Sequence, residues 1–368
     1  MITEKYPQGH ARCVKIATIV GARPQFIKCA PLSKELRRAN EEVLIHTGQH
    51  YDYEMSRVFF EELDIPEPEY NLGIGSGSHG AQTGKALAAT EEVLIKEEPD
   101  LVLVYGDTNS TLAGALAAAK LNIRVAHVEA GLRSYDRTMP EEVNRVLTDH
   151  LSDLLFTPTK QAVSNLGKEG VRKGVHRVGD VMVDSLSKAR EAAKTPSRVL
   201  CALGLEPRSY LAMTMHRPQN TDDPGRLRAI IKSLSKIDQK IIFPAHPRTK
   251  KALVSLDMLD GMPANVTVID PLGYVDMVRL MMGARVVITD SGGIQKEAFL
   301  LGVRCITMRE TTEWPETLAG GMNRLVGADP AKIMLEASRP FQGRRGRTRP
   351  FGSPGASKRI ADVIEKFQ

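Results

Sequence analysis

Short apolar runs rich in β-branched residues alternate with longer stretches of helical period along most of the chain. This alternation is typical of βα units, in which helices connect parallel strands. In the first half, the strands are expected at 14–20, 43–47, 101–105, 123–128 and 154–157, and the helices at 27–38, 80–96, 110–120 and 141–150. The pattern predicts a doubly wound α/β domain.

The second half repeats the same pattern. Its strands are expected at 210–215, 241–245, 266–269, 286–289 and 304–308, with helices that include 226–235 and 292–301. We therefore expect two Rossmann-like doubly wound domains, 1–178 and 179–352, and a C-terminal helix within 353–368 that packs back on the first domain. Parallel sheets bind ligands beyond the carboxyl ends of their strands, so two such domains facing each other predict a central cleft.

Composition narrows the class of protein. A chain of 368 residues with 42% hydrophobic and 26% charged residues is long and apolar enough for two folded domains, which excludes disorder as the main state. Lysine and arginine total 50 against 44 acidic residues, a net charge of +6. Much of this excess is local, in Arg344, Arg345, Arg347 and Arg349. Without interleaved aromatic residues, this run is typical of a solvated loop, and we expect no nucleic-acid partner.

The four cysteines lie far apart without a CxxC pair, so we expect them to be reduced and mostly buried. The first ten residues lack the apolar segment of a signal peptide, and no later run reaches about 18 apolar residues. These features predict a soluble cytoplasmic protein with no membrane contact.

Polar residues follow several expected strands of the first half. Arg23 and Lys28 belong to the turn and helix after 14–20, where an anionic group would bind, although an exposed arginine is also common in such turns. Asp107 follows 101–105, where it would serve either a site or a helix cap. Glu129 follows 123–128, and burial of such a side chain is unfavourable unless it serves a site. No GxGxxG follows the first strand, which weighs against a dinucleotide cofactor.

Further candidates lie at other strand and helix ends. Glu141, in the first turn of a helix, is either a site residue or a partner of the helix dipole. His216 and His246 each follow a strand, as acids, bases or phosphate ligands, or as ordinary hydrogen-bonded side chains. His46 and His50 are four residues apart, but Thr47 and Gly48 form a turn between them, so we expect no metal site.

The strongest single element is Asp290-Ser291-Gly292-Gly293, which follows the strand 286–289 and opens a helix. Backbone N–H groups and the positive end of the helix dipole suit a diphosphate, and Glu297 could accept ribose hydroxyls. The alternative is a tight turn whose glycines serve packing alone.

These motifs follow one another in a recognisable order. They are Gly21-Ala-Arg-Pro-Gln-Phe-Ile-Lys28, His46-Thr-Gly-Gln-His50, Gly106-Asp-Thr108, His127-Val-Glu-Ala-Gly-Leu-Arg133, Pro140-Glu-Glu-Val-Asn-Arg145, His216-Arg217, Asp290-Ser-Gly-Gly293 and Thr312-Glu313. The series resembles the non-hydrolysing UDP-N-acetylglucosamine 2-epimerase family over about 16–326 and again in the C-terminal helix.

The resemblance implies a fold similar to glycosyltransferase B and a homodimer that needs neither a nicotinamide nor a metal cofactor. It implies interconversion of UDP-GlcNAc and UDP-ManNAc through loss of UDP to 2-acetamidoglucal and its re-addition. The implied catalytic residues are Asp107, Glu129, Glu141 and His216. The implied UDP-sugar contacts are Arg23, Lys28, Arg133, His246, Ser291, Gly292, Gly293, Glu297, Arg309, Thr312 and Glu313.

Several positions depart from the commonest family pattern. Gln25, Lys296 and Trp314 replace residues that are frequent in the family, and the combination is similar to the branch that epimerises UDP-2,3-diacetamido-2,3-dideoxyglucuronate. Gln49 and His50 match an allosteric site of some members, whereas Asp52 and the segment 245–248 depart from it. A retaining UDP-sugar glycosyltransferase and a nucleotide-sugar sensor are the alternatives from other classes.

Overall fold

The computed structural model describes residues 13–49, 62–340 and 349–367. It divides the chain into two compact units: the first ends at Ser185, the second begins at Leu186, and the chain returns to the first at Phe351. We call them unit 1 and unit 2. The predicted join at 178–180 precedes this crossing, and the predicted central cleft remains a prediction.

Unit 1 contains a sheet of seven parallel strands in the order β3-β2-β1-β4-β5-β6-β7. The strands are β1 (Lys15–Val20), β2 (Glu41–His46), β3 (Tyr70–Asn71), β4 (Leu101–Tyr105), β5 (Arg124–Val128), β6 (Leu154–Thr157) and β7 (Val175–Arg177). Strand order reverses between β1 and β4, which pair in a register that places Ile16 beside Leu101. Such a reversal opens a crevice at the carboxyl ends of the strands.

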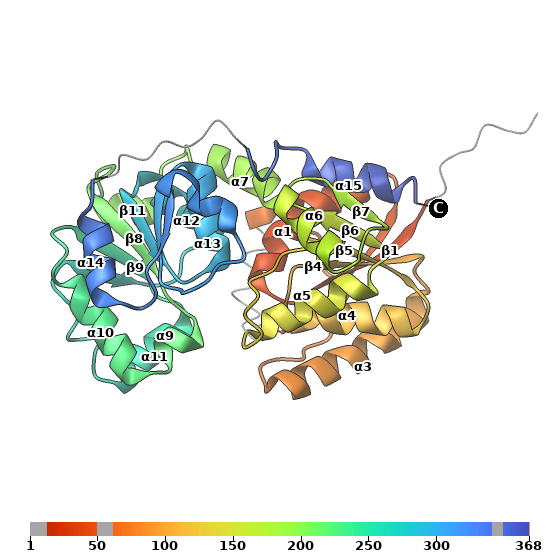
Figure 1. The fold of residues 1–368 in the computed structure, drawn as a ribbon, viewed down its shortest axis with the longest axis horizontal. Helices are drawn as coiled ribbons and strands as arrows, with labels where there is room; N and C mark the ends of the chain where they lie inside the picture. Colours follow the sequence, from red (N-terminus) through yellow and green to blue (C-terminus); the bar gives the residue numbers. More distant parts are fainter. Residues whose placement is uncertain (1–12, 50–61, 341–348, 368) are drawn as a thin grey trace, which may run out of the picture. The chain divides into compact units, whose positions relative to one another are not determined.

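Helices cover both faces of this sheet (Figure 1). They are α1 (Arg23–Leu36), α3 (His79–Glu97), α4 (Asn109–Lys120), α5 (Pro140–Leu151), α6 (Lys160–Lys168), the first residues of α7 (Val181–Ala192), and α15 (Ala356–Ile364). The helices α3, α4 and α5 pack side by side, and α15 packs on α1. Asp184 accepts hydrogen bonds from the N–H groups of Gly355 (2.6 Å) and Ser357 (2.8 Å), which fixes the start of α15.

Unit 2 contains six parallel strands in the order β10-β9-β8-β11-β12-β13. The strands are β8 (Tyr210–Thr214), β9 (Lys240–Pro244), β10 (Val266–Ile269), β11 (Val286–Thr289), β12 (Arg304–Thr307) and β13 (Asn323–Leu325). This is the strand order of the Rossmann fold, with its reversal between β8 and β11.

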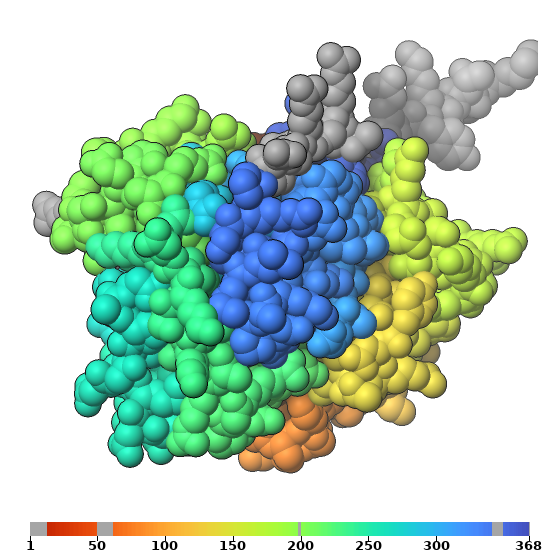
Figure 2. Space-filling model, turned by 60° about the vertical axis from the view of Figure 1, so that its left-hand side comes forward, coloured from red at the N-terminus to blue at the C-terminus, as the bar shows by residue number. Residues whose placement is uncertain are grey.

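The remaining elements of unit 2 surround this sheet. They are α8 (Arg198–Ala202), α9 (Pro218–Thr221), α10 (Pro224–Leu234), α11 (Pro247–Ser255), α12 (Tyr274–Gly283), α13 (Gly292–Leu301), the 3-10 segment η1 (Pro315–Gly321) and α14 (Pro330–Ser338). Figure 2 shows α14, in blue, on the outer surface, where Leu335 is exposed while Ile333 packs into the core.

The predicted fold class is confirmed: both halves are doubly wound α/β units with parallel sheets. The first helix begins at Arg23 and not at 27, because Pro24 suits the first turn, where its missing N–H has no intrahelical partner. Two of the four cysteines, Cys13 and Cys201, are exposed, so the expectation of mostly buried cysteines is wrong for these two. Within the described ranges, no helix is long and apolar enough to cross a membrane.

Candidate active site

The predicted site residues of unit 1 lie where its strands end. Gly21 follows β1, Gly106 and Asp107 follow β4, and Glu129 follows β5, the strand paired with β4. Gln25 connects two of these ends: its Oε1 accepts from Gly21 N–H (2.8 Å), and its Nε2 donates to Tyr105 O (2.9 Å). Arg23, half-buried, begins α1 beside this turn.

Lys28 on α1 forms an ion pair with Glu129, and both side chains are buried. The backbone of Glu129 has φ +77°, a conformation that costs a side-chain-bearing residue energy unless its surroundings hold it there. Gly106 lies against this pair: a Cβ there would be 3.3 Å from Lys28 Nζ and 3.4 Å from Glu129 Oε2. The ammonium offsets part of the cost of burying the Glu129 carboxylate.

Asp107 is held by Arg145 of α5. Arg145 Nη2 lies 2.5 Å from Asp107 Oδ2, and its Nη1 lies 2.7 Å from Glu142 Oε2. Arg145 is buried, whereas 31% of the Asp107 side chain is exposed. Asp107 therefore combines a buried cationic partner with an accessible carboxylate edge.

Glu142 holds the backbone of the segment that precedes α5 through hydrogen bonds. Its carboxylate accepts from the N–H groups of Ser134 (2.9 Å) and Tyr135 (2.8 Å) as well as from Arg145. Burial alone would raise the pKa of Glu142, but these donors outweigh it and hold the pKa below its ordinary value. Glu142 is thus an ionised structural carboxylate at neutral pH.

Glu141, one residue earlier in α5, is in a different environment. It is half-buried, and within the described part of the chain its carboxylate has no hydrogen-bond or ion-pair partner. Asn144, one turn further along α5, donates to Asp107 O (2.9 Å). Glu141 therefore lies on the same helix as Asn144, which contacts the Asp107 turn.

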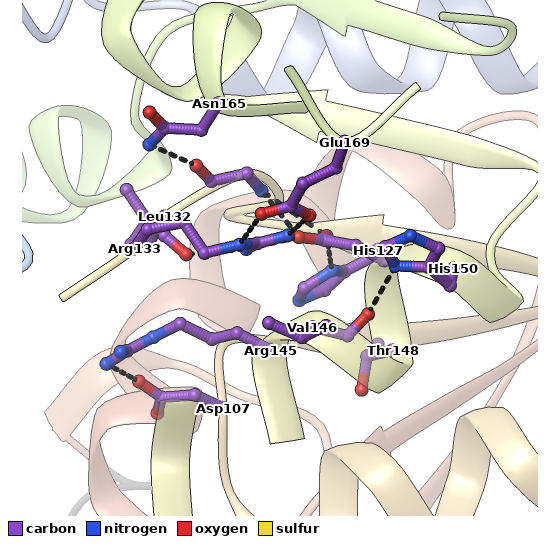
Figure 3. A network of polar contacts seen from close by, with 12 residues as sticks. Asp107, His127, Leu132, Arg133, Arg145, Val146, Thr148, His150, Asn165 and Glu169 are labelled. Atoms are coloured by element: carbon purple, nitrogen blue, oxygen red, sulfur yellow. Dashed lines mark hydrogen bonds and ion pairs between the residues drawn. The ribbon is translucent and has the colours of Figure 1, made fainter. Parts of the chain in front are cut away.

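Arg133 lies in a buried network that Figure 3 shows together with the Arg145–Asp107 pair. Its Nη1 donates to Asp149 (2.7 Å), and its Nε and Nη2 donate to Glu169 (2.7 and 2.6 Å). Asp149 in turn lies 2.8 Å from His127 Nδ1. These contacts favour a positioning role for Arg133 over direct contact with a ligand.

Gln49 lies next to the start of α4. Its Oε1 accepts from the N–H (3.0 Å) and the hydroxyl (2.7 Å) of Ser110. The side chain is therefore connected to the helix that follows the Asp107 turn. His50, its predicted neighbour in an allosteric site, lies outside the described residues, so that prediction is not tested.

Unit 2 places His216 at the end of β8, beside a buried carboxylate. Asp290 accepts from the N–H groups of His216 (3.1 Å) and Arg217 (3.0 Å), and from Asn220 Nδ2 (3.0 Å). His216 Nδ1 lies 3.4 Å from Asp290 Oδ1, and 42% of the His216 side chain is exposed. The His246 ring lies 5.7 Å from that of His216, centroid to centroid, so the two predicted histidines are neighbours.

Ser291 caps α13 at the end of β11: its Oγ accepts from Ile294 N–H at 3.4 Å. A Cβ on Gly292 would lie 2.0 Å from Glu313 Oε1, and Arg309 Nη1 lies 2.8 Å from Glu313 Oε2. The first N–H groups of a helix and its dipole suit an anion. Unit 2 therefore brings the predicted Gly292, Arg309 and Glu313 together at the start of α13.

The rest of the predicted set in unit 2 surrounds α13. Glu297 is buried one turn into the helix. Thr312 Oγ1 donates to Gln295 Oε1 (2.7 Å), and Asn323 Nδ2 donates to the same oxygen (3.1 Å). Within the ranges that the structure describes, no three His, Cys, Asp or Glu side chains gather as a metal ion would require.

Several residues that the structure connects to the site had no predicted role. Arg145, His127 and Asn144 were visible only as members of motifs, Gln25 was visible as a departure from the family pattern, and Asp149 carried no signal of its own. Each acts through a contact with a residue distant in sequence, which a single sequence does not show.

Comparison with known proteins supports the same interpretation. The family model described as UDP-N-acetylglucosamine 2-epimerase matches residues 34–365. A UDP-N-acetylglucosamine 2-epimerase homolog of Methanococcus maripaludis is 52% identical over 96% of this chain and 100% of its own length. The UDP-2,3-diacetamido-2,3-dideoxy-D-glucuronate 2-epimerase of Pseudomonas aeruginosa is 46% identical, again over 96% of this chain and all of its own.

A solved structure matches the whole fold. The crystal structure of Methanocaldococcus jannaschii UDP-GlcNAc 2-epimerase, in complex with UDP-GlcNAc and UDP, superimposes with a TM-score of 0.90 at 44% identity. The match covers 96% of this chain and 99% of that one. With strand-end carboxylates in one unit and a glycine-opened helix in the other, this chain belongs to the UDP-N-acetylglucosamine 2-epimerase family.

Proposed function

We propose that this protein is a 2-epimerase of a UDP-linked 2-acetamido sugar and that it interconverts UDP-GlcNAc and UDP-ManNAc. The observation that carries the proposal is the pair of carboxylates at the ends of neighbouring strands β4 and β5, each with its own buried cation. Asp107 is paired with Arg145, and Glu129 with Lys28.

The proposed reaction removes the proton at C2 of the sugar while the C1–O bond to UDP breaks. The electrons of the C2–H bond form the C1=C2 double bond of 2-acetamidoglucal, and UDP leaves with those of the C1–O bond. UDP then returns to C1, and C2 receives a proton on the opposite face. Because no electrons are gained or lost overall, the reaction requires no redox cofactor.

The proton leaves one face of C2 and returns on the opposite face, so the reaction requires more than one acid or base. Carboxylates in different environments suit these different tasks. Glu129 is buried against Lys28, Asp107 is partly exposed beside Arg145, and Glu141 has no partner within the described chain. We assign proton transfer at C2 to these three carboxylates. His216, oriented beside Asp290, is assigned to assist departure and return of UDP.

We assign the nucleotide chiefly to unit 2. The start of α13, with Ser291, Gly292 and Gly293, supplies backbone N–H groups and a positive dipole end for the diphosphate. The pair of Arg309 and Glu313 adjoins this turn. The remaining proposed contacts are His246, Glu297, Thr312 and, from unit 1, Arg23. Binding of UDP by the M. jannaschii relative supports this assignment.

A second substrate has a specific observation in its favour. The P. aeruginosa relative is named for UDP-2,3-diacetamido-2,3-dideoxy-D-glucuronate, and its identity of 46% is close to the 45% of a Methanococcus maripaludis UDP-N-acetylglucosamine 2-epimerase. Lys296 and Trp314, two of the departures that are similar to the branch acting on this sugar, contact each other. Lys296 is buried, and its Nζ lies 3.9 Å from the Trp314 ring centroid. Because the two identities differ by one percentage point, turnover of each sugar is the property that distinguishes the two substrates.

Proton NMR in D2O tests the proposal, with each nucleotide sugar supplied alone to the purified protein. The expected result is loss of the C2 proton signal together with an anomeric signal of the manno configuration. Turnover of only the diacetamido uronate would assign the second substrate. UDP release that requires an added acceptor would instead identify a glycosyltransferase. An unchanged spectrum with both sugars would refute the epimerase proposal.

We further propose that the protein acts in the cytoplasm as a homodimer, with a UDP-sugar as its ligand and no nucleic-acid or membrane partner. Family membership supports this proposal. Light scattering coupled to size-exclusion chromatography tests the dimer. A measured mass of 40.4 kDa, which is that of a single chain, would contradict it.

A further inference from the structure

His127 lies on β5 with both of its ring nitrogens facing oxygen atoms. Nδ1 is 2.8 Å from Asp149 Oδ1, and Nε2 is 2.8 Å from the carbonyl oxygen of Gly106. The side chain is fully buried. A neutral imidazole carries one N–H and one bare nitrogen, so it can donate to only one of two such acceptors.

The partner at Nδ1 is an ionised carboxylate. Asp149 also accepts from Gly131 N–H (3.1 Å) and from Arg133 Nη1 (2.7 Å), so its oxygens face donors. Burial alone would raise the pKa of Asp149, but the contacts with His127 and Arg133 outweigh burial and lower it. Asp149 therefore does not supply the proton that a bare Nδ1 would need.

The charges around His127 balance when its ring carries both protons. Asp149 from α5, Arg133 from the segment after β5, and Glu169 at the end of α6 form one connected cluster with it. With a protonated His127 this cluster contains two positive and two negative groups. A neutral ring would leave a net negative charge in a largely buried cluster, which is costly.

The same pair of side chains contacts both turns that carry the proposed catalytic carboxylates. His127 Nε2 contacts Gly106 O, and Gly106 immediately precedes Asp107. Asp149 accepts from Gly131 N–H, two residues after Glu129. Gly106 and Gly131 have φ of +64° and +80°, which glycine adopts without steric cost. Because glycine also has the most backbone freedom, contacts of this kind restrict each turn to one conformation.

We propose that His127 is held as a buried imidazolium and that, with Asp149, it is the positioning residue that fixes the Gly106–Asp107 turn relative to the turn of Glu129. The inference rests on the proposed function, because it assigns importance to these turns through their carboxylates. His127 itself stays protonated and transfers no proton to the substrate.

The first test is the protonation state of the ring in the unliganded wild-type protein. Histidine labelled with nitrogen-15 gives distinct signals for protonated and bare ring nitrogens, and His127→Gln identifies the His127 signals by their loss. Because Nδ1 and Nε2 both face acceptor oxygens, two protonated nitrogens are expected at neutral pH. A bare nitrogen would overturn the proposal.

Two substitutions separate the hydrogen bonds of the ring. His127→Gln has the longer side chain, which can still donate to Gly106 O, whereas His127→Asn can donate to Asp149 but does not reach Gly106 O. His127→Asn is expected to lower kcat by about 10²-fold, the effect of misplacing a reacting group by about 1 Å, and to leave KM within about twofold. His127→Gln is expected to lower kcat less.

His150→Gln is the matched control, since His150 is an exposed histidine on α5 that contacts Val146 O. It should remove its own NMR signals and leave kcat unchanged. Equal losses for both His127 variants, or a loss in KM alone, would contradict positioning. Because the NMR measurement needs no substrate, failure of the proposed function and failure of this inference are distinguishable.

Discussion

The guanidinium of Arg145 joins two carboxylates of different character. It contacts Asp107, which is partly exposed, at 2.5 Å and Glu142, which is buried, at 2.7 Å. Glu142 is fixed by two backbone N–H groups, so Arg145 is oriented by a rigid partner and can hold Asp107 in one place. The planar fork of the guanidinium allows Arg145 to bridge the two carboxylates with separate nitrogens.

Arg145→Lys should therefore lower kcat by about 10²-fold, because a single ammonium cannot contact both carboxylates in the same geometry. The KM for the UDP-sugar should change little. Steady-state kinetics measure both constants, and Arg137→Lys, an exposed residue of the preceding segment, is the control that should behave as wild type. Wild-type kcat in Arg145→Lys would refute the proposed link between Arg145 and Asp107.

Asp107→Asn, Glu129→Gln and Glu141→Gln should each reduce epimerisation by about 10²- to 10⁴-fold, the usual contribution of a general acid or base. UDP binding, measured by calorimetry, should persist because the nucleotide is assigned to unit 2. Three variants with unchanged turnover would remove these carboxylates from the account. Loss of UDP affinity in all three would instead place them in the nucleotide site.

Gly292→Ala should destabilise unit 2 by about 1–3 kcal/mol, as overpacking of a dense site does. The added Cβ would lie 2.0 Å from Glu313 Oε1, and Glu313 cannot move away without disturbing its buried contact with Arg309. Gly293→Ala is the matched control, since the nearest atom to its Cβ is Ser291 Oγ at 3.9 Å. Equal thermal stability of the two variants would contradict this packing.

Acid stability should depend on Glu142. Because its folded pKa is lowered, its contribution to the free energy of unfolding is present at neutral pH and is lost as pH falls through that folded pKa. Glu142→Gln should therefore cost about 1.5–3 kcal/mol at pH 7, the value of hydrogen bonds to a charged group. Urea unfolding should show this difference shrinking once the pH is below the ordinary glutamate pKa of about 4.3. A difference independent of pH would contradict the assignment.

The sequence pattern was sufficient to predict most strands of the two sheets and the residues at which several of them end. The strands 101–105, 154–157, 266–269 and 286–289 were predicted with the bounds that the structure shows, because each is a short run rich in apolar and β-branched residues. The strands β3, β7 and β13, with two or three residues each, carry no such run and were not expected.

The side-chain contacts of the site residues could not be predicted in the same way. Glu129 was expected to need a site, but its pairing with Lys28 joins residues 101 positions apart, and sequence spacing contains no information on such a contact. Lys296 and Trp314 were singled out separately as departures from the family pattern. The structure places the Lys296 ammonium over the Trp314 ring, so the two departures form one cation–π contact.

The most direct test of the account is whether the bond between C1 of the sugar and UDP breaks during turnover. UDP-GlcNAc labelled with oxygen-18 in the C1–O bridge should be incubated with the wild-type protein, and the label followed by phosphorus NMR. The account predicts migration of the label into the non-bridging positions of the β-phosphate, accompanied in D2O by deuterium at C2. Epimerisation with the label retained in the bridge would contradict elimination and return of UDP.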